Sequence, residues 1–86
     1  MKTNINYKIV QAISSETRIK IMEVLAKGEE CACKLPSAVN KSQPAVSQHL
    51  AILRSAGLVR VRKEGTMMKY SLSEKGKKIV QDMWRW

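Results

Sequence analysis

Residues 42–70 constrain this 86-residue chain most, because they predict a capped helix that runs directly into a tight hairpin. Ser42 is a favourable N-cap, and Pro44 falls in the first turn, where its missing backbone N–H removes no hydrogen bond. At about 100° per residue, the helix has an apolar stripe and an opposite face of short or polar residues. The two sets are Val46, Leu50 and Leu53 on the stripe, and Pro44, Ser47, Gln48, Ala51 and Ser55 opposite. We expect the stripe to pack in a core and the other face to stay open.

The segment after this helix predicts two short antiparallel strands. Gly57 supplies the left-handed residue that commonly ends a helix. From Leu58 to Lys63 apolar and basic residues alternate, Glu64-Gly65 is a turn signal, and the alternation then resumes. The first strand separates Val59 and Val61 from Arg60 and Arg62, and the second separates Met68, Tyr70 and Leu72 from Met67, Lys69 and Ser71.

Two helices are expected at the start of the chain. The first carries an apolar stripe, and Ser14-Ser15-Glu16 then restarts the chain with an N-cap signal. The second helix runs from about Ser15 to Lys27 and ends at Gly28. The apolar positions are Ile5, Ile9, Ala12 and Ile13 in the first helix, and Ile19, Met22, Leu25 and Ala26, which we expect to be buried, in the second.

A short third helix holds Leu35, Ala38 and Val39, and Asn40-Lys41 turns into the helix that begins at Ser42. This close spacing is typical of a helix-turn-helix. Ser73 is expected to cap a final helix. Residues 1–86 therefore predict a single domain that is mainly α with a small β-hairpin. The class is a winged helix-turn-helix of about five helices and a two-stranded wing.

The charge of the chain favours a polyanionic partner. Sixteen Lys and Arg against seven Asp and Glu give a formal net charge of +9 and a pI near 10.0. Basic residues on a hairpin beside an open helix face point to double-stranded DNA. Gln48 and Ser47 can pair with base edges, whereas groups at the helix start suit phosphate. The predicted DNA-binding residues are Ser42, Gln43, Ser47, Gln48, His49, Arg60, Arg62, Lys63 and Lys69.

His49 lies about 60° from the apolar stripe of its helix, so two interpretations stay open. The commoner outcome for such a histidine is a hydrogen bond to its own scaffold or to a phosphate, and the other is a contact with a base.

The terminal helices are expected to pair across a homodimer. An 86-residue chain buries only about 60% of its unfolded surface, and a two-fold protein matches an inverted-repeat operator. The alternative is that both stripes cover the core of their own protomer. The predicted interface residues are Ile5, Ile9, Ile79, Val80, Met83 and Trp84.

No apolar run approaches the length that spans a membrane, and the start MKTNINYK lacks the apolar stretch of a secretory signal. Two cysteines one residue apart fit a reducing compartment better than a disulfide scaffold. We therefore expect a cytoplasmic protein without a membrane partner.

Cys31 and Cys33, in GEECACKLPSAV, are the second informative feature. Within a helix their side chains would point about 200° apart. However, Pro36 is comfortable only in a first turn, so the third helix can hardly begin before Ala32, and the cysteines lie at its entrance, where they can converge. Thiolates there would bind a thiophilic ion. A third ligand would come from Glu29, Glu30, a backbone oxygen, solvent or the other subunit, and the alternative is a pair of structural thiols.

The chain resembles the ArsR/SmtB family of winged-helix repressors over about residues 8–80. The resemblance rests on SSETRIKIMEVL, GEECACKL, SQPAVSQHLAILRSAGLV and VRKEGTMMKYSL. It implies a homodimer that binds an inverted repeat and leaves it when a metal or metalloid binds. The arsenic and cadmium branch has the pattern ELCVCDL, which Glu29, Cys31, Cys33 and Leu35 match. Cys31 and Cys33 thereby inherit the role of metal ligands.

Two departures from the family stand out. Lys34 replaces an acidic residue and Glu30 a leucine of the branch pattern, and no further cysteine follows the pair. The family's other common site uses histidines on the last helix, and residues 73–86 contain none.

The sequence thus predicts a repressor that needs no cofactor and has an inducer ion such as As(III), Sb(III) or Cd(II). Two alternatives stay open: a thiol-redox-responsive repressor using the same cysteines, and a sequence-tolerant chromatin protein. An enzyme is not expected, because a thiol oxidoreductase would want an acid or base near the cysteines and His49 is the single histidine.

Overall fold

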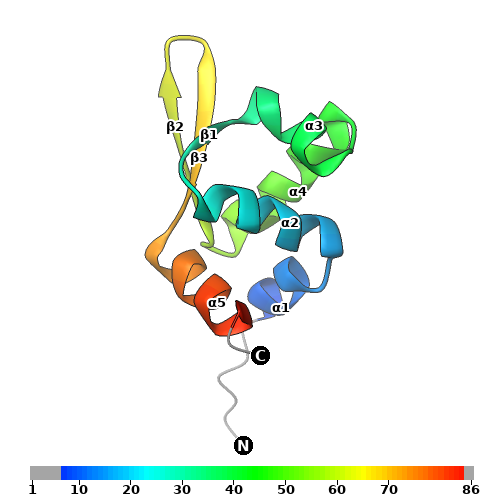
Figure 1. Cartoon of the computed structure of the whole chain (residues 1–86), viewed down its shortest axis with the longest axis vertical. Helices are drawn as coiled ribbons and strands as arrows, with labels where there is room; N and C mark the ends of the chain where they lie inside the picture. Colours follow the sequence, from blue (N-terminus) through cyan, green and yellow to red (C-terminus); the bar gives the residue numbers. More distant parts are fainter. Residues whose placement is uncertain (1–6, 85–86) are drawn as a thin grey trace, which may run out of the picture.

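The computed structural model describes residues 7–84, in which five α-helices surround a core and a β-hairpin projects from one end (Figure 1). The elements are α1 (Tyr7–Ile13), α2 (Glu16–Ala26), β1 (Glu30–Cys31), the 3₁₀ turn η1 (Ala32–Lys34), α3 (Leu35–Val39), α4 (Gln43–Ser55), β2 (Val59–Glu64), β3 (Met67–Leu72) and α5 (Glu74–Trp84). The winged helix-turn-helix prediction is confirmed. Within residues 7–84 every helix is too short or too polar to cross a bilayer.

Serine side chains begin three of the helices, as predicted. The Oγ atoms of Ser15 and Ser42 each accept a hydrogen bond from a backbone N–H three residues on, at 3.2 Å, and Ser73 Oγ accepts one from Gly76 at 3.0 Å. Each bond satisfies one of the N–H groups that a helix start leaves unpaired. These caps fix where α2, α4 and α5 begin.

Left-handed residues end α3 and α4. Asn40, at φ 57°, closes α3, and only Asn40, Lys41 and Ser42 separate α3 from α4, which makes the tight helix-turn-helix. Gly57, at φ 75°, follows α4. There the N–H of Leu58 donates to the carbonyl of Leu53 at 3.0 Å, a Schellman closure that leads directly into β2.

The wing differs from the prediction in two respects. The sheet has three strands in the order β1-β3-β2, because the two residues of β1 pair with the edge of β3. A two-residue strand has too little alternation to be recognised in a sequence. The hairpin turn is Gly65-Thr66 rather than Glu64-Gly65, since Glu64 still pairs with Met67 and Gly65 takes the positive φ of 63°. The predicted alternation on both strands is confirmed by the register Val61↔Tyr70 and Arg62↔Lys69.

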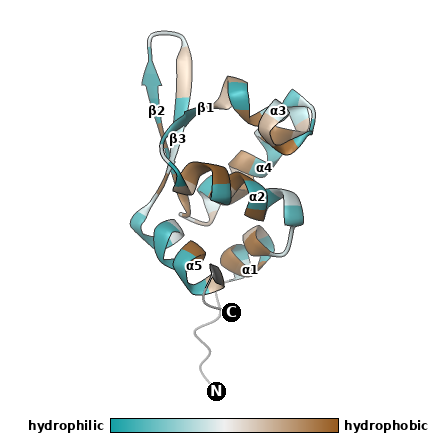
Figure 2. Cartoon of the chain, in the orientation of Figure 1, coloured by the Kyte–Doolittle hydropathy of each residue, from teal (hydrophilic) through white to brown (hydrophobic). Residues whose placement is uncertain are grey.

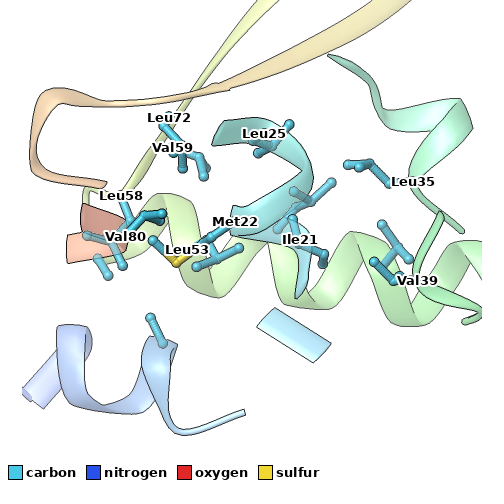
Figure 3. Close-up of a cluster of buried hydrophobic side chains, with 14 residues drawn as sticks. Ile21, Met22, Leu25, Leu35, Val39, Leu53, Leu58, Val59, Leu72 and Val80 are labelled. Atoms are coloured by element: carbon cyan, nitrogen blue, oxygen red, sulfur yellow. The ribbon is translucent and has the colours of Figure 1, made fainter. Parts of the chain in front are cut away.

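The core lies between α2, α3, α4, α5 and the base of the hairpin (Figure 3). The predicted stripe of α4 is fully buried. In α2 the prediction was partly wrong, because Ile21 is buried whereas Ile19 is half-buried and Ala26 is exposed. Ala26 is the last residue of α2. The largest buried side chains are Ile21, Met22, Leu35, Leu50, Leu53, Leu58, Val46 and Val80.

Candidate nucleic-acid interface and cysteine pair

The outer face of α4 carries the side chains predicted to meet DNA. Ser42, Gln43, Ser47 and Gln48 are all exposed, while Val46, Leu50 and Leu53 anchor the opposite face in the core. The helix start is solvent-exposed. Pro44 has no N–H, and those of Ala45 and Val46 donate to Ser42, so within this first turn the N–H of Gln43 is left to reach a phosphate. The predicted division between a packed and an open face is therefore confirmed.

His49 faces the scaffold. Its Nδ1 lies 3.0 Å from Nη1 of Arg18 on α2. Since a guanidinium can only donate, Nδ1 is the acceptor and the ring is neutral with its proton on Nε2. Partial burial and the positive charges of Arg18 and Lys41 lower the pKa of His49 below its ordinary value. The scaffold interpretation of His49 is thus the one that the structure supports.

Arg18 is a residue that the sequence analysis missed. Besides contacting His49, it donates from Nε to the carbonyl of Ala12 at 3.1 Å and from Nη2 to that of Gln11 at 2.8 Å. One guanidinium thereby joins the end of α1 to α2 and α4. No local pattern announces such a role, because its partners are 6, 7 and 31 residues away.

Of the four predicted wing cations, two form ion pairs within the described part of the chain and two do not. Arg62 donates to both carboxylate oxygens of Glu29, at 2.7 and 2.8 Å, and Lys69 lies 2.7 Å from Glu64. In contrast, Arg60 and Lys63 are exposed and form no ion pair among residues 7–84. These two cations are the ones ready for a phosphate, whereas Arg62 and Lys69 must first leave carboxylates.

The ion pairs affect the protonation of the wing. The hydrogen bonds from Arg62 lower the pKa of Glu29, and the same contact raises the pKa of Arg62. Lys69 similarly lowers the pKa of Glu64. All four side chains are in contact with solvent, so salt weakens these pairs.

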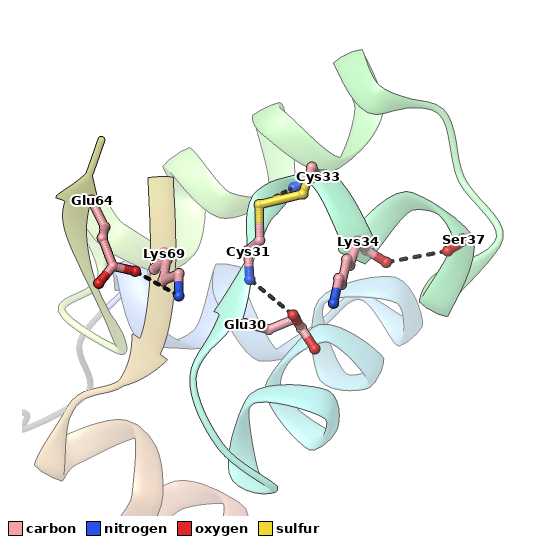
Figure 4. The surroundings of a disulfide bond; sticks show 7 residues. All are labelled: Glu30, Cys31, Cys33, Lys34, Ser37, Glu64 and Lys69. Carbon is pink, nitrogen blue, oxygen red and sulfur yellow. Dashed lines mark hydrogen bonds and ion pairs between the residues drawn. A yellow bond between two sulfur atoms is a disulfide. The ribbon is translucent and has the colours of Figure 1, made fainter. Parts of the chain in front are cut away.

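Cys31 and Cys33 lie where β1 passes into η1, and a disulfide joins them (Figure 4). The expectation of free thiols is therefore corrected for this state of the chain. Cys31 has extended backbone angles and Cys33 lies in η1, whereas α3 starts only at Leu35, so the bond lies outside α3. As predicted, helical structure begins no earlier than Ala32, and Pro36 lies in the first turn of α3.

The two cysteines differ in their surroundings. Cys31 is buried, and its Sγ accepts a hydrogen bond from the N–H of Cys33 at 3.2 Å, while Cys33 is exposed. The N–H of Cys31 donates to Oε1 of Glu30 at 3.0 Å. A pocket of about 170 Å³ opens at the pair, bordered also by Lys34, Met67 and Lys69.

Several residues predicted for the dimer interface instead pack against the core of their own protomer. Val80 is buried in the core of its own chain, so its side chain is not available to a partner. Ile9, Ile79 and Met83 are half-buried against the same core. Ile5 and the side chain of Trp84 lie outside the described residues. The exposed apolar side chains of α1 are instead Tyr7 and Val10, on a largely hydrophobic helix at the end of the molecule opposite the wing tip (Figure 2).

The chain is similar to known DNA-binding regulators in both sequence and fold. The chain is 39% identical over 83 residues to the arsenical resistance operon repressor of Escherichia coli. The aligned region covers 91% of this chain and 71% of that protein. Its fold is similar to that of HlyU from Vibrio cholerae, with a TM-score of 0.83, 36% identity and coverage of 92% and 87%. It is also similar to a homodimeric winged helix-turn-helix DNA-binding domain from Mycobacterium bovis, with a TM-score of 0.86, 26% identity and coverage of 92% and 74%.

Residues 15–61, more than half of the chain, match the sequence model of the arsR family of bacterial regulatory proteins. This match covers α2, the cysteine pair, the helix-turn-helix and the first half of β2. The chain belongs to the ArsR family of winged-helix transcriptional regulators.

Proposed function

We propose that this protein is a homodimeric, sequence-specific repressor in the cytoplasm that binds an inverted-repeat operator and leaves it when a thiophilic metal or metalloid binds reduced Cys31 and Cys33. One observation carries this proposal: Cys31 pairs with Lys69 of β3, so the cysteine segment and the wing belong to one sheet. A ligand that moves β1 acts directly on the wing. The kinship with an arsenical resistance operon repressor supports As(III), Sb(III) or Cd(II) as inducer ions.

The DNA-binding roles divide by position. Gln48 and Ser47, in the middle of the open face of α4, read base edges, and Ser42 and Gln43 hold phosphate at the helix start. Arg60 and Lys63 bind phosphate from the wing, and Arg62 and Lys69 join them once they leave their carboxylates. His49 supports α4 through Arg18 and does not read a base.

Release is a coupling between two sites. A ligand that binds the DNA-free conformation more tightly than the DNA-bound one weakens operator binding. The loss equals the difference between its two binding free energies, typically about 1–3 kcal/mol. Two contacts link the cysteine segment to the wing and can transmit this coupling. They are the pairing of β1 with β3 and the ion pair between Glu29 and Arg62.

Oxidation is a second candidate signal, favoured by the disulfide itself. In that case an oxidant takes two electrons from the dithiol, and a cellular dithiol returns them. The bond lies in the segment that joins β1 to α3, and β1 pairs with β3 of the wing.

The deciding experiment uses Cys31→Ser and Cys33→Ser, with Ala32→Ser as a control that adds a hydroxyl to the same segment and removes no sulfur. Neither cysteine lies on the DNA-facing surfaces proposed above, so all three variants should bind the operator. We expect the two cysteine variants to lose release by As(III), Cd(II) or peroxide, while Ala32→Ser keeps it. Release at the parent's inducer concentration by both cysteine variants would refute the proposal.

A further inference from the structure

The cysteine pair lacks a conventional third ligand. Among residues 7–84 no three His, Cys, Asp or Glu side chains converge as a metal site. One other sulfur atom is close, however, because the pocket at Cys31 and Cys33 is also lined by Met67. Met67 is 49% exposed, so its sulfur atom is accessible to an ion from solvent.

The sheet register explains this proximity. Cys31 pairs with Lys69, and paired residues on adjacent strands project from the same face. Met67 is two residues before Lys69 on β3, so it projects from that face as well. Because the strands run antiparallel, the chain leaves Cys31 toward Cys33 in the direction in which β3 leads back to Met67.

We propose that, in the reduced protein, the thiolates of Cys31 and Cys33 and the thioether of Met67 form a three-sulfur site for a soft monovalent ion, Cu(I) or Ag(I). This inference rests on the proposed role of the cysteines as the input. A dithiol first reduces the disulfide, supplying two electrons and two protons and becoming a disulfide itself. Binding of the ion then releases the two thiol protons.

The donor set favours soft ions over harder ones. Thiolate and thioether ligands together suit Cu(I), whereas Zn(II) gains little from a neutral thioether. Two thiolates and a monovalent ion leave one negative charge, and in the pocket lining the charges of Lys34 and Lys69 are balanced by those of Glu29 and Glu30. The sulfur donors, and not the charge of the lining, therefore select the ion. Because Met67 is the first residue after the hairpin turn, the ion would tie the wing to β1 and so act on DNA binding.

Met68 provides a matched control. It is the next residue, is also exposed at 40%, and pairs with Lys63 on the opposite face of the hairpin, away from the cysteines. Replacing either methionine by leucine keeps an apolar side chain of similar volume at an exposed position, so both variants should fold.

The test uses the whole chain, labelled with ¹³C on the methionine methyl groups, reduced with a phosphine, separated from the phosphine without oxygen and then titrated with Ag(I). We expect the methyl signal of Met67 to shift and to saturate at one ion per subunit, while that of Met68 stays in place. Competition with a Cu(I) chelator should show about tenfold weaker binding in Met67→Leu, equivalent to ~1.4 kcal/mol. Met68→Leu should bind Cu(I) as the parent does, and Zn(II) affinity should be the same in all three proteins.

The contrary outcomes separate this inference from the proposed function. If Cys31→Ser abolishes Cu(I) binding and Met67→Leu leaves it unchanged, the thioether is not a ligand although the cysteines are. If Met67→Leu and Met68→Leu weaken binding equally, the effect belongs to the hairpin as a whole and the three-sulfur site is refuted. If Cys31→Ser and Cys33→Ser leave binding intact, the proposed input site is wrong as well.

Discussion

Arg62 of β2 holds both carboxylate oxygens of Glu29, a residue 33 positions away that directly precedes β1. The Nε–Oε2 and Nη2–Oε1 distances are 2.7 and 2.8 Å, which is the paired geometry of a strong arginine–carboxylate contact. A cation suited to bind phosphate is thereby held by the segment that bears the cysteines. If Arg62 binds phosphate as proposed, Glu29 and DNA compete for the same guanidinium.

Glu29→Gln should therefore tighten binding to any duplex. Without the carboxylate, Arg62 is free to neutralise a phosphate, and the salt dependence of log K should steepen by about 0.9 for each additional phosphate that a subunit neutralises. Binding titrations at several salt concentrations measure this slope. Glu16→Gln makes the same charge change in the first turn of α2, and an equal increase in affinity in both variants would assign the effect to net charge instead of to the ion pair.

Two glutamines of α4 should respond differently to truncation. Gln48→Ala should cost about 1–3 kcal/mol on the operator and little on random DNA, because a bidentate contact with a base carries sequence information. Gln43→Ala, at the helix start, should weaken both duplexes alike, since phosphate contacts do not specify sequence. An operator selected from a random duplex library serves for both measurements. Equal losses on the two duplexes for Gln48→Ala would remove it from the base-reading set.

The sequence predicts those features that depend on local chemistry. Ser42, Gly57 and the alternation in β2 and β3 act within a few residues, so helix ends and strand faces were predicted correctly. The contacts of Glu29 with Arg62 and of Arg18 with His49 join residues more than 30 positions apart, and they depend on how the elements pack. For the same reason β1 and the place of Met67 beside the cysteines could not be predicted, because both follow from docking against β3.

The contact between Arg18 and His49 should make stability depend on pH. The pKa of folded His49 lies below its ordinary value of about 6.5, so between these values the unfolded chain binds more protons. The stability that neutral His49 contributes is thus complete above about pH 6.5 and is lost as the pH falls through the folded pKa. His49→Asn keeps a hydrogen-bond acceptor and cannot titrate. Urea unfolding at one protein concentration should show the parent losing stability relative to His49→Asn from about pH 7 to pH 5; parallel curves would contradict the assignment.

Val10 tests whether the exposed apolar side chains of α1 take part in the proposed homodimer. Its side chain is 47% exposed on α1, so Val10→Asp should leave the protomer folded while placing a charge on an apolar contact. We expect sedimentation to show more monomer at a given concentration and operator binding to weaken accordingly. Gln11→Asp, at the next and exposed position, is the matched control. If both variants sediment as the parent does, the dimer uses another surface.

Gly76 tests how α5 is fixed to the rest of the molecule. An alanine normally stabilises a helix by about 1 kcal/mol relative to glycine. At Gly76, however, a Cβ atom would collide with the backbone carbonyl of Leu58 and would lie 3.2 Å from Cδ2 of Leu72. That carbonyl already accepts a hydrogen bond from the N–H of Ser73 at 3.0 Å, so it cannot move without breaking the start of α5.

Gly76→Ala should therefore lower the free energy of unfolding by about 1–3 kcal/mol, the usual cost of overpacking a well-packed site. Lys77→Ala changes the neighbouring exposed residue and should have a small effect. Because α5 is a proposed part of the dimer, thermal unfolding of both variants is compared with the parent at equal concentration. If Gly76→Ala were as stable as the parent, α5 could shift along β3 at little cost, and the rigid junction of Leu58, Ser73 and Gly76 would not exist.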